Sequence, residues 1–409
     1  MIKIKNILVL AGGDSTRLWP LERKGLVNFL GKPLIQYVLE NLAPYAEKLI
    51  VVSNSRDKSS IDMIVSETKK HQSCKFDVFV QNEKMASQAG AILAAENKVD
   101  GEILIVNSND IFNPGIIPDL LKQSRKQNLE FILTAKSVKK YFPVGYLILD
   151  KQKLKGIVER PLPEKIPSNY VRLVVDYYQD FEKLIETIKR VNNPGDNAYE
   201  EALNIAIGSL RSGFLPYNDY WFTIKYPWHI LTMMNYFLKK LGNQEVKLGR
   251  NVKIGKNSKI VGPAFIGDNT VIGDFTMVRE SHIGSNCTIG GYCEVTRSYL
   301  SDNVQLHRNF VGDSVLGPEV SMGAGATTAN FRFDKKTVKS TNGKGGVDTN
   351  LVKCGAFVGQ NARIGVNATI LPGIKIGKNT FVGPGEVVDR DLGDNLFVFK
   401  NKQVKNTSI

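Results

Sequence analysis

The sequence has few of the residues that build disulfide-linked or metal-centred proteins. It contains four cysteines and four histidines among 409 residues. Cys287 and Cys293 are six residues apart but lack a CxxC pair or a histidine-rich partner, so we expect small buried thiols there. The N-terminus alternates charged and aliphatic residues, as an opening strand does, and has no recognisable export signal. The reducing cytoplasm is therefore the expected compartment.

Long apolar runs are also missing. No stretch approaches the roughly 20 apolar residues that a membrane-spanning helix needs, so we expect no membrane partner. The formal net charge is +14. We find no nucleic-acid-binding motif and no basic amphipathic helix, so we expect no nucleic acid partner. The charge fits phosphorylated small molecules, and part of it fits a solvated lysine-rich surface.

Residues 1–241 alternate short β-rich runs with helical patterns. This alternation is typical of an α/β domain with a mixed, mostly parallel sheet flanked by helices. Ligands of such sheets bind at the carboxyl ends of the strands. A last helical pattern is expected to close the domain, with Gly242 as its C-cap. The expected strands are 7–10, 49–52, 76–80 and 103–106, and the expected helices are 34–42, 61–68, 86–95 and 228–241.

A six-residue period follows a linker at 242–247. Isoleucine or valine recurs every sixth residue from Ile254 to Val278 and from Val358 to Val388, and glycine commonly follows it. Six is the repeat of a parallel β-helix, in which each hexad supplies a short strand and a turn. We expect the aliphatic residue to point inward and the glycine to permit the tight corner. The expected parts are a β-helix over 248–391, an inserted polar loop over 329–355, and a tail over 392–409.

A glycine-containing turn, LAGGDSTRLWPL, begins at Leu10 after the first expected strand. The backbone N–H groups of Gly12 and Gly13 can approach phosphate oxygens closely. Arg17 can add a bidentate contact to a phosphate. An ordinary turn can have the same composition, so the turn alone indicates phosphate binding only weakly.

The same segment resembles the signature of sugar-1-phosphate nucleotidyltransferases, G-x-G-T-R followed by a lysine shortly before G-K-P. Lys24 stands seven residues before Gly31 of the G-K-P sequence, and the resemblance spans nearly the whole first domain. It implies that a sugar-1-phosphate oxygen attacks the α-phosphate of an NTP, with Mg²⁺ as cofactor and pyrophosphate leaving. The resemblance assigns catalysis to Arg17 and Lys24, the nucleotide to Leu10, Gly12, Gly13 and Gln81, the metal to Asp110, and the sugar to Gly145 and Glu159.

Several positions depart from the family pattern. Because hard cations prefer several carboxylate and phosphate oxygens, Asp110 without a second carboxylate would hold Mg²⁺ weakly. An active nucleotidyltransferase with altered specificity and a domain that binds but does not turn over nucleotide therefore both stay open. The departures are Ser15 for a loop glycine, Arg23 for a proline, Ser87-Gln88 for Gly-Thr, Arg172 for a sugar-contacting asparagine, and Thr223 for the second metal-binding aspartate.

The C-terminal half contains a second spaced set. His307 is followed by Phe310 and by Gly312-Asp313, Asn330 comes seven residues after Gly323, and Lys336 comes six residues later. This spacing resembles the acetyltransferase half of bifunctional N-acetylglucosamine-1-phosphate uridylyltransferases. Acetyl-CoA is the co-substrate that the resemblance implies. It assigns the general base to His307, the orientation of the amine or oxyanion to Asn330, and the sugar phosphate to Arg279, Lys336 and Lys339.

The combined expectation is a bifunctional transferase that acetylates a hexosamine-1-phosphate and then joins the product to UTP, giving a UDP-N-acetylhexosamine. The resemblance also implies a left-handed coil and a homotrimer with active sites between subunits. Two alternatives stay open, namely an acetyltransferase with an inactive first domain and a purely structural or regulatory trimer. The sugar is open as well, because Phe310 replaces a tyrosine, Thr296 a phosphate-binding lysine, and Ser321 an asparagine.

Overall fold

The computed structural model describes residues 2–85, 87–192, 195, 197–342, 345–400 and 402–405. The chain divides into two compact units, each discontinuous in sequence. Unit 1 comprises Met1–Asp14 and Leu34–Phe222, and unit 2 comprises Ser15–Pro33 and Thr223–Ile409. This division differs from the expected domain bounds, because two segments of the first expected domain, 15–33 and 223–241, pack in unit 2.

Aromatic packing explains this difference. The last helix, α7 (His229–Lys239), was expected to close the α/β domain, and the structure corrects that expectation. Phe237 of α7 stacks on Phe29, with ring centroids 5.0 Å apart, and Phe29 in turn lies 5.7 Å from the ring of Tyr299 in the coil. The Tyr299 hydroxyl donates a hydrogen bond of 2.8 Å to the carbonyl of Asn28. A local sequence pattern cannot reveal such contacts between residues about 270 positions apart.

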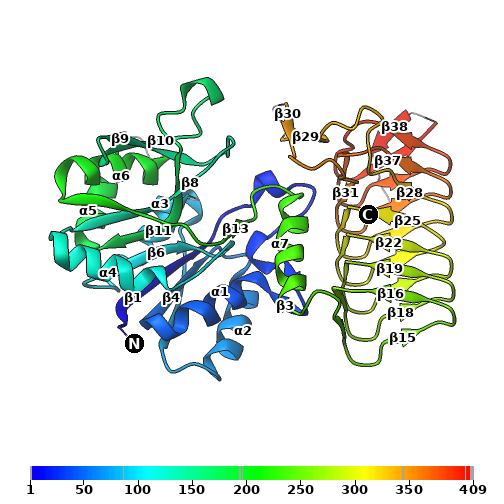
Figure 1. Ribbon diagram of the computed structural model, residues 1–409, viewed down its shortest axis with the longest axis horizontal. Coiled ribbons are helices and arrows are strands. Elements are labelled where there is room, and N and C mark those ends of the chain that lie inside the picture. The colour runs from blue at the N-terminus through cyan, green and yellow to red at the C-terminus, as the bar shows by residue number, and fades with distance from the viewer. Residues whose placement is uncertain are drawn as a thin grey trace. The chain divides into compact units, whose positions relative to one another are not determined.

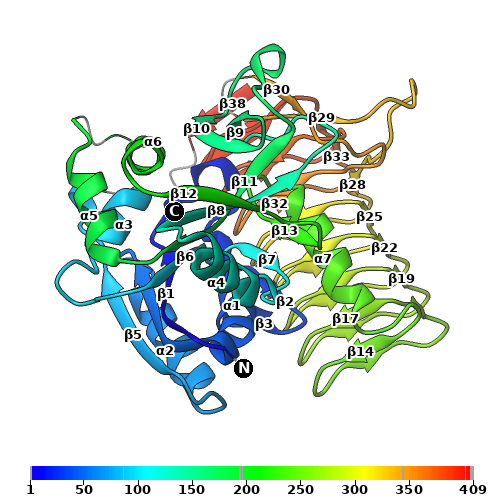
Figure 2. The ribbon, with the colours of Figure 1, turned by 60° about the vertical axis from the view of Figure 1, so that its left-hand side comes forward.

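Unit 1 is built on a mixed sheet with the order β10-β9-β11-β6-β1-β4-β5, and β8 joins it through β11 (Figure 2). The four expected strands are confirmed, and they pair in parallel as β6-β1-β4-β5. Strand β11 pairs antiparallel with β6, β8 and β9. The strands are β1 (Ile4–Ala11), β4 (Ala46–Ser53), β5 (Lys75–Val80), β6 (Ile103–Asn107), β8 (Phe131–Ser137), β9 (Gly145–Asp150), β10 (Lys153–Glu159), β11 (Tyr170–Tyr178) and β12 (Ser212–Pro216).

The expected helices of unit 1 are also present. The third is shorter than expected, because Ser87 caps it by accepting a hydrogen bond of 3.2 Å from the Gly90 N–H. Ala86, the first residue of that expected helix, lies outside the described residues. The helices are α1 (Leu34–Leu42), α2 (Lys58–Lys69), α3 (Gln88–Leu93), α4 (Ile116–Gln127), α5 (Phe181–Lys189) and α6 (Ala198–Ser209). A short strand, β7 (Asp110–Phe112), precedes α4, and another, β13 (Trp221–Thr223), follows α6 and β12.

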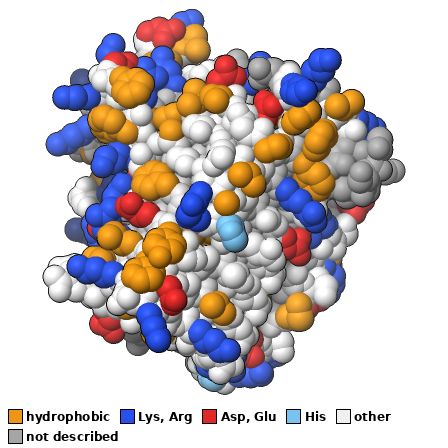
Figure 3. Space-filling model, turned by 90° about the vertical axis from the view of Figure 1, so that its right-hand side faces the viewer, with side chains coloured by type: hydrophobic (Ala, Val, Ile, Leu, Met, Phe, Trp, Pro, Cys, Tyr) orange, Lys and Arg blue, Asp and Glu red, His pale blue; other side chains and the backbone are white. Residues whose placement is uncertain are grey.

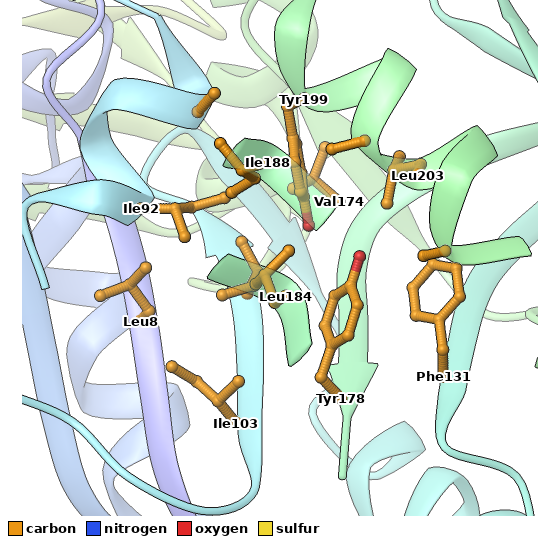
Figure 4. Close-up of a cluster of buried hydrophobic side chains, with 14 of the residues drawn as sticks. Leu8, Ile92, Ile103, Phe131, Val174, Tyr178, Leu184, Ile188, Tyr199 and Leu203 are labelled. Atoms are coloured by element: carbon orange, nitrogen blue, oxygen red, sulfur yellow. The ribbon is translucent and has the colours of Figure 1, made fainter. Parts of the chain in front are cut away.

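Three helices bury their apolar faces against the sheet of unit 1. Figure 4 shows Ile92 of α3, Leu184 of α5 and Leu203 of α6 directed into one cluster with side chains of the strands. Leu8 and Ile103, on the parallel strands β1 and β6, belong to the same cluster and are fully buried. This packing fixes the central strands, whose carboxyl ends carry the residues discussed below.

Unit 2 contains a left-handed parallel β-helix whose short strands stack into three sheets (Figure 1). The prediction that the repeated aliphatic residues point inward is confirmed, since the isoleucines and valines at every sixth position from Val358 to Val388 are at most 4% exposed. Ile254 is 44% exposed because the first rung has no rung beneath it. The sheets run β14-β17-β20-β23-β26-β31-β34 (sheet D), β15-β18-β21-β24-β27-β32-β35-β37-β38 (sheet E) and β16-β19-β22-β25-β28-β33-β36 (sheet F).

The strands of the coil are two to four residues long. They are β14 (Val246–Leu248), β15 (Lys253–Ile254), β16 (Lys259–Val261), β17 (Ala264–Ile266), β18 (Val271–Ile272), β19 (Met277–Arg279), β20 (His282–Ile283), β21 (Thr288–Ile289), β22 (Glu294–Thr296), β23 (Tyr299–Leu300), β24 (Gln305–Leu306), β25 (Phe310–Gly312), β26 (Val315–Leu316), β27 (Ser321–Met322), β28 (Thr327–Thr328), β31 (Phe357–Val358), β32 (Arg363–Ile364), β33 (Thr369–Ile370), β34 (Lys375–Ile376), β35 (Phe381–Val382), β36 (Val387–Val388), β37 (Leu396–Phe399) and β38 (Lys402–Lys405).

The role expected for the repeated glycines needs correction. The left-handed corners of one row are made by asparagines, such as Asn269 and Asn286 with φ of 59° and 56°, and their side chains hydrogen-bond from rung to rung at 3.2 Å. The glycine after the aliphatic residue permits close stacking instead. A Cβ on Gly267 would lie 2.6 Å from the backbone of Gly284 in the next rung. Glycine is needed there because the rungs approach each other too closely for a side chain.

The expected bounds of the coil also change. Strands β23 to β28 continue the coil through residues 299–328, inside the expected range, although they follow one another in steps of five and six residues. The changes are at the two ends. The expected linker contains part of β14, and the expected tail contains β37, which pairs with β35. The inserted loop carries a hairpin, β29 (Lys339–Thr341) and β30 (Gly346–Asp348). Gly343, Lys344 and 406–409 lie outside the described residues.

Cys287 and Cys293 are buried and free, as expected, and so are Cys74 and Cys354. Burial raises the pKa of Cys287 to about 12, which makes it an unreactive thiol. Within the described ranges, no three His, Cys, Asp or Glu side chains gather as a metal site would require. None of the described helices is long and apolar enough to cross a bilayer.

His282 occupies a stack of aromatic rings on sheet D. Its ring lies 4.9 Å from that of Phe265 and 4.7 Å from that of Tyr299, the residues above and below it in register. The side chain is buried, and Nδ1 lies 3.4 Å from the carbonyl oxygen of Leu300. Among the described residues Nε2 has no hydrogen-bond partner. Burial lowers the pKa of His282 to about 4.

This histidine should make the fold sensitive to acid. The folded pKa is below the ordinary value of 6.5, so unfolded chains bind the proton first, and stability is lost as the pH falls from about 6.5 to about 4. Protonation of His282 lowers the free energy of unfolding by about 3 kcal/mol over that pH range. Urea unfolding measures the free energy of unfolding at pH 7 and at pH 4.5. The decrease between these pH values should be smaller for His282→Phe than for the unchanged protein. Equal losses would contradict the assignment.

Candidate functional sites

The end of β1 and the residue after β5 form the candidate nucleotide site of unit 1. The carbonyl of Gly12 accepts hydrogen bonds from Gln81 Nε2 at 2.9 Å and from Asn54 Nδ2 at 3.3 Å. Leu10 is buried, and its carbonyl accepts from the Ser108 N–H at 3.1 Å. Gly13 is exposed, with open space where a Cβ would stand. The structure therefore brings Gly12 and Gln81 together, as the sequence analysis expected of nucleotide-binding residues.

Asp110 lies at the start of β7 and is buried. Its Oδ1 accepts a hydrogen bond of 3.2 Å from Asn109, and its Oδ2 accepts one of 3.3 Å from the indole of Trp221. Both carboxylate oxygens are thus oriented by neighbours in unit 1. One oriented carboxylate fits a Mg²⁺ that takes its remaining oxygens from phosphates and water.

Gly145 and Glu159 face each other across the antiparallel pair β9–β10. A Cβ on Gly145 would lie 3.1 Å from Glu159 Oε2, so the glycine makes room for the carboxylate. Arg160 also holds that carboxylate, with Nε 2.8 Å from Oε1. The two residues expected to contact the sugar are therefore adjacent.

Arg172 does not take over the role of the asparagine it replaces. Its buried guanidinium donates to both oxygens of Asp176, with Nε 3.2 Å from Oδ1, and lies 4.8 Å from the ring centroid of Tyr199. Nη1 lies 3.5 Å from Glu200. Burial opposes its charge, but Asp176 overcomes this and raises the pKa of Arg172. Its hydrogen bonds thus serve the core of unit 1.

The segment with Arg17 and Lys24 lies in unit 2. Arg17 is in a short 3-10 turn, η1 (Thr16–Leu18), and Lys24 begins another, η2 (Lys24–Leu26). Ser15 keeps the left-handed conformation that a glycine would adopt there, with φ of 58°, and its hydroxyl accepts a hydrogen bond of 3.2 Å from the Lys24 N–H. Arg23 has φ of 55°, which proline cannot adopt. The backbone before Lys24 therefore differs from one that carries proline.

His229 was not among the expected site residues. Its Nδ1 accepts a hydrogen bond of 3.1 Å from the Lys225 N–H, so this nitrogen is unprotonated. Burial, together with the charges of Lys225, Arg17 and Lys24, lowers the pKa of His229 to about 3. The ring is therefore neutral and lies in a cluster of cations within unit 2. No local motif marks this position, and only the fold gathers the three cations around it.

The second candidate site lies on the edge of sheet F. Arg279, Thr296 and Gly312 are register partners on β19, β22 and β25. The Thr296 hydroxyl accepts from Arg279 Nε at 3.1 Å and from Arg297 Nη1 at 3.1 Å. Thr296 thus orients two guanidinium groups at the position of the family's lysine. Carboxylates offset both charges, since Arg279 Nη2 pairs with Glu294 at 3.0 Å and Arg297 Nε pairs with Asp313 at 2.7 Å.

Asn330 meets this edge at the next rung. Its Nδ2 donates a hydrogen bond of 2.5 Å to Asp313, whose carboxylate also pairs with Arg297 at 2.7 Å. A Cβ on Gly312 would lie 2.5 Å from Asn330 Nδ2 and 2.9 Å from the ring of Phe310. The structure therefore brings Asn330, Asp313, Phe310 and Gly312 together. Asp313 orients Asn330 toward the edge of the sheet.

His307 lies at a different corner of the coil. It follows β24 in sheet E and precedes β25 in sheet F, whereas Asn330 follows β28 in sheet F. Three residues of β25 separate the two corners, and this length of strand spans about 10 Å. Asn309 holds the His307 corner by donating to the carbonyls of Gly323 at 2.8 Å and Ala326 at 2.9 Å. One chain alone does not bring His307 and Asn330 into contact.

Lys336 and Lys339 lie on the insertion, and both are exposed. Ser340 fixes the base of the hairpin β29–β30 by donating a hydrogen bond of 2.7 Å to the Gly373 carbonyl. Phe333, near Lys336, is fully exposed. Figure 3 shows lysine, arginine and hydrophobic side chains exposed together on one face of the molecule. An exposed basic segment beside apolar side chains suits both phosphate binding and contact with another chain.

Family models match both parts of the chain. The model described as nucleotidyl transferase matches residues 6–211, and the model described as bacterial transferase hexapeptide (six repeats) matches 245–280 and 355–386. A solved structure of UDP-glucose pyrophosphorylase with UDP-glucose is 20% identical with a TM-score of 0.50, and covers 59% of this chain and all of that one. A putative glucose-1-phosphate thymidylyltransferase from Bacillus anthracis also has a TM-score of 0.50 at 17% identity, and covers 57% of this chain and 95% of that one. These likenesses show the fold of the first part.

Curated relatives match nearly the whole chain. The bifunctional protein GlmU of Methanococcus vannielii is 27% identical over 97% of this chain and 98% of its own. The bifunctional sugar-1-phosphate nucleotidylyltransferase/acetyltransferase of Sulfurisphaera tokodaii is 31% identical over 95% of this chain and 98% of its own. The chain is therefore a transferase that belongs to the family of bifunctional sugar-1-phosphate nucleotidylyltransferase/acetyltransferases.

Proposed function

We propose that the chain makes a UDP-N-acetylhexosamine in two steps. Its coil transfers the acetyl group of acetyl-CoA to a hexosamine-1-phosphate, and its first part then joins the product to UTP with release of pyrophosphate. The observation that carries the acetyl step is the cluster of Asn330, Asp313 and Phe310 beside Arg279 on the edge of sheet F. The name of the Sulfurisphaera relative and the order of motifs along the chain support both steps.

The acetyl step needs a base, an oriented amide and cations. His307 takes a proton from the amine as the amine nitrogen bonds to the thioester carbon. The carbon–sulfur bond then breaks, and the leaving sulfur takes up the proton from His307 to give CoA thiol. Asn330, oriented by Asp313, holds the amine or the oxyanion. Arg279, Lys336 and Lys339 bind the sugar phosphate. The exposed position of His307 suits a group that meets substrate from solvent.

This chemistry requires more than one chain. His307 and Asn330 lie at different corners of the coil, and the strand between the two corners is about 10 Å long. The base and the amide of one subunit therefore cannot both contact the amine of one substrate. In a homotrimer, the His307 corner of one subunit faces the Asn330 corner of its neighbour. The exposed Phe331 and Phe333 give the insertion apolar surface for such a contact.

The nucleotidyl step needs little covalent chemistry from the protein. The sugar phosphate oxygen attacks the α-phosphorus of UTP, and the bond to pyrophosphate breaks. Gly12, Gly13 and Gln81 hold the nucleotide, Gly145 and Glu159 hold the sugar, and Arg17 and Lys24 neutralise charge on the phosphates. A Mg²⁺ held by Asp110 and the phosphates would supply further neutralisation when bound. The four free buried thiols suit a reducing cytoplasm.

The first test removes the proposed base. With acetyl-CoA and glucosamine-1-phosphate, His307→Ala should lower the rate of CoA thiol release by about 10²- to 10⁴-fold, because proton abstraction is lost. Pyrophosphate release should not change. His71→Ala, at an exposed histidine of unit 1, serves as the control. An acetylation rate close to that of the unchanged protein would remove His307 from the mechanism.

A second test addresses the metal carboxylate. Pyrophosphate release from UTP and N-acetylglucosamine-1-phosphate should depend on Mg²⁺, and Asp110→Asn should lower it by about 10²-fold or more while sparing acetyl transfer. Asp62→Asn, which breaks only a surface pair with Lys58, should leave the rate unchanged. If the unchanged protein releases no pyrophosphate with UTP, dTTP or any sugar-1-phosphate tried, the nucleotidyl proposal fails.

The contact between Gly12 and Gln81 supplies a third test. In Gly12→Ala the new Cβ would lie 2.3 Å from Gln81 Oε1, so the glutamine must move. We expect weaker UTP binding by calorimetry and a free energy of unfolding lower by about 1–3 kcal/mol. Gly13→Ala adds its Cβ to open space and should change the unfolding free energy by no more than about 0.5 kcal/mol. Equal destabilisation by both would contradict the close contact.

A further inference from the structure

Lys375 is a buried lysine that neither proposed reaction uses. It lies on β34 in sheet D and is 2% exposed. A lysine is almost never buried unless it has partners that replace water. Its partners come from three segments that are far apart in the sequence, and all of them lie in unit 2.

The first two partners are indole rings. Lys375 Nζ lies 5.7 Å from the ring centroid of Trp19 and 5.7 Å from that of Trp228. Both distances are within the range of cation–π attraction, which strengthens when the cation is desolvated. Trp19 is two residues after Arg17, and Trp228 directly precedes α7. The lysine thus holds the segment with Arg17 and Lys24 against the coil.

The third partner is the hairpin of the insertion. Lys375 Nζ donates a hydrogen bond of 2.5 Å to the carbonyl of Thr341 in β29. Asp391 receives hydrogen bonds from the Thr341 hydroxyl and from the Lys375 N–H, the latter at 2.9 Å. A Cβ on Gly373 would lie 2.3 Å from the carbonyl oxygen of Lys339. The rung that carries Lys375 therefore also sets the backbone position of Lys339.

Further contacts near Lys375 hold the N-terminal end of residues 19–28 on the coil. Trp19 Nε1 donates a hydrogen bond of 2.8 Å to Asp394, and Lys378 pairs with Glu22 at 2.7 Å. The opposite end is anchored by Asn28 and Phe29 at Tyr299. Between the anchors, the segment lies over a cavity of about 470 Å³ lined by residues that include Leu21, Leu26, Tyr299 and Gln360.

Because of this cavity, the contacts at the two ends of the segment have a large effect on its position. A segment packed on a solid core keeps its position when one contact is lost, because its neighbours are close-packed. Most of residues 20–28 line a cavity instead, so the position of Lys24 depends on the two anchored ends together with its own hydrogen bond to Ser15. Loss of the Lys375 anchor would therefore displace the segment rather than be absorbed locally.

We propose that Lys375 is a positioning residue shared by the two reactions, since it holds Trp19 beside the Arg17–Lys24 segment and Thr341 beside Lys339 on one rung of the coil. This inference rests on the proposed function for its kinetic consequences, while its structural part stands independently. Burial lowers the pKa of Lys375 to about 8, against the charge of Asp391, and the indoles and the carbonyl oxygen stabilise the protonated form.

The structural test is hydrogen exchange on the full chain. In Lys375→Met, peptides covering 16–24 and peptides covering 338–341 should both exchange about 10-fold faster, while peptides of the first rungs stay unchanged. Lys253→Met is the matched control, because Lys253 holds the same place in its hexad but is exposed. Faster exchange in only one of the two segments, or in neither, overturns the shared role. This readout needs no activity.

The kinetic test uses both assays on the same variants. Lys375→Met should raise KM for the amino-sugar phosphate about 10-fold with little change in kcat, and should lower kcat/KM for UTP about 10-fold. Lys375→Arg keeps the cation and the donor and should restore both values to within about threefold. If Lys375→Met lowers the melting temperature but leaves both sets of constants unchanged, Lys375 is merely structural and the proposal fails.

A further variant keeps the proposal testable if Lys375→Met does not accumulate as folded protein. Lys375→Gln retains a donor for Thr341 but places no charge between the indoles. It should speed exchange in 16–24 more than in 338–341. Equal exchange in the two segments would contradict the division of roles between the indoles and the carbonyl.

Discussion

The rest of unit 2 depends on direct stacking of one rung of the β-helix on the next. Backbone hydrogen bonds and buried aliphatic side chains hold each rung on its neighbour, and the approach is so close that Gly267 leaves no room for a Cβ. Such stacking aligns the corners in rows. Arg279, Thr296 and Gly312 are therefore register partners, and the residues proposed for acetyl transfer lie where an edge of sheet F meets the insertion. The coil acts as a rigid scaffold for side chains at its corners.

The regular stacking of the rungs also keeps apart two groups that the proposed acetyl transfer requires at one substrate. His307 and Asn330 occupy two corners of one coil, so in the proposed account a single subunit supplies half of each acetyl site. The rung of Lys375 has the opposite effect, because it gathers Trp19, Trp228 and Thr341 from three segments. In the proposed account, the order of the rungs therefore has two effects. It divides the acetyl site between chains, and within one chain it brings together the segments that position the residues of both active sites.

Much of the fold could be predicted because its signals are local. The hexad period and the alternation of strands and helices depend on neighbouring residues, and both predictions are confirmed. The unit boundary could not be predicted, because it depends on Phe29, Trp19 and Phe237 packing with residues distant in sequence. The asparagine corners were missed because the repeated glycine was the stronger pattern. At the candidate sites, spacing indicated His307 and Asn330, whereas His229, Asn309 and Lys375 acquire their settings only through the fold.

The division of the acetyl site between subunits is the central claim, and mixed trimers test it most directly. His307→Ala and Asn330→Ala should each abolish acetyl transfer alone. When the two variants are co-expressed and mixed trimers are purified with separate affinity tags, sites with one intact histidine and one intact asparagine form at the interface, and CoA thiol release should return. Mixed trimers that stay as inactive as either variant would contradict the account, because base and amide would then have to come from the same chain.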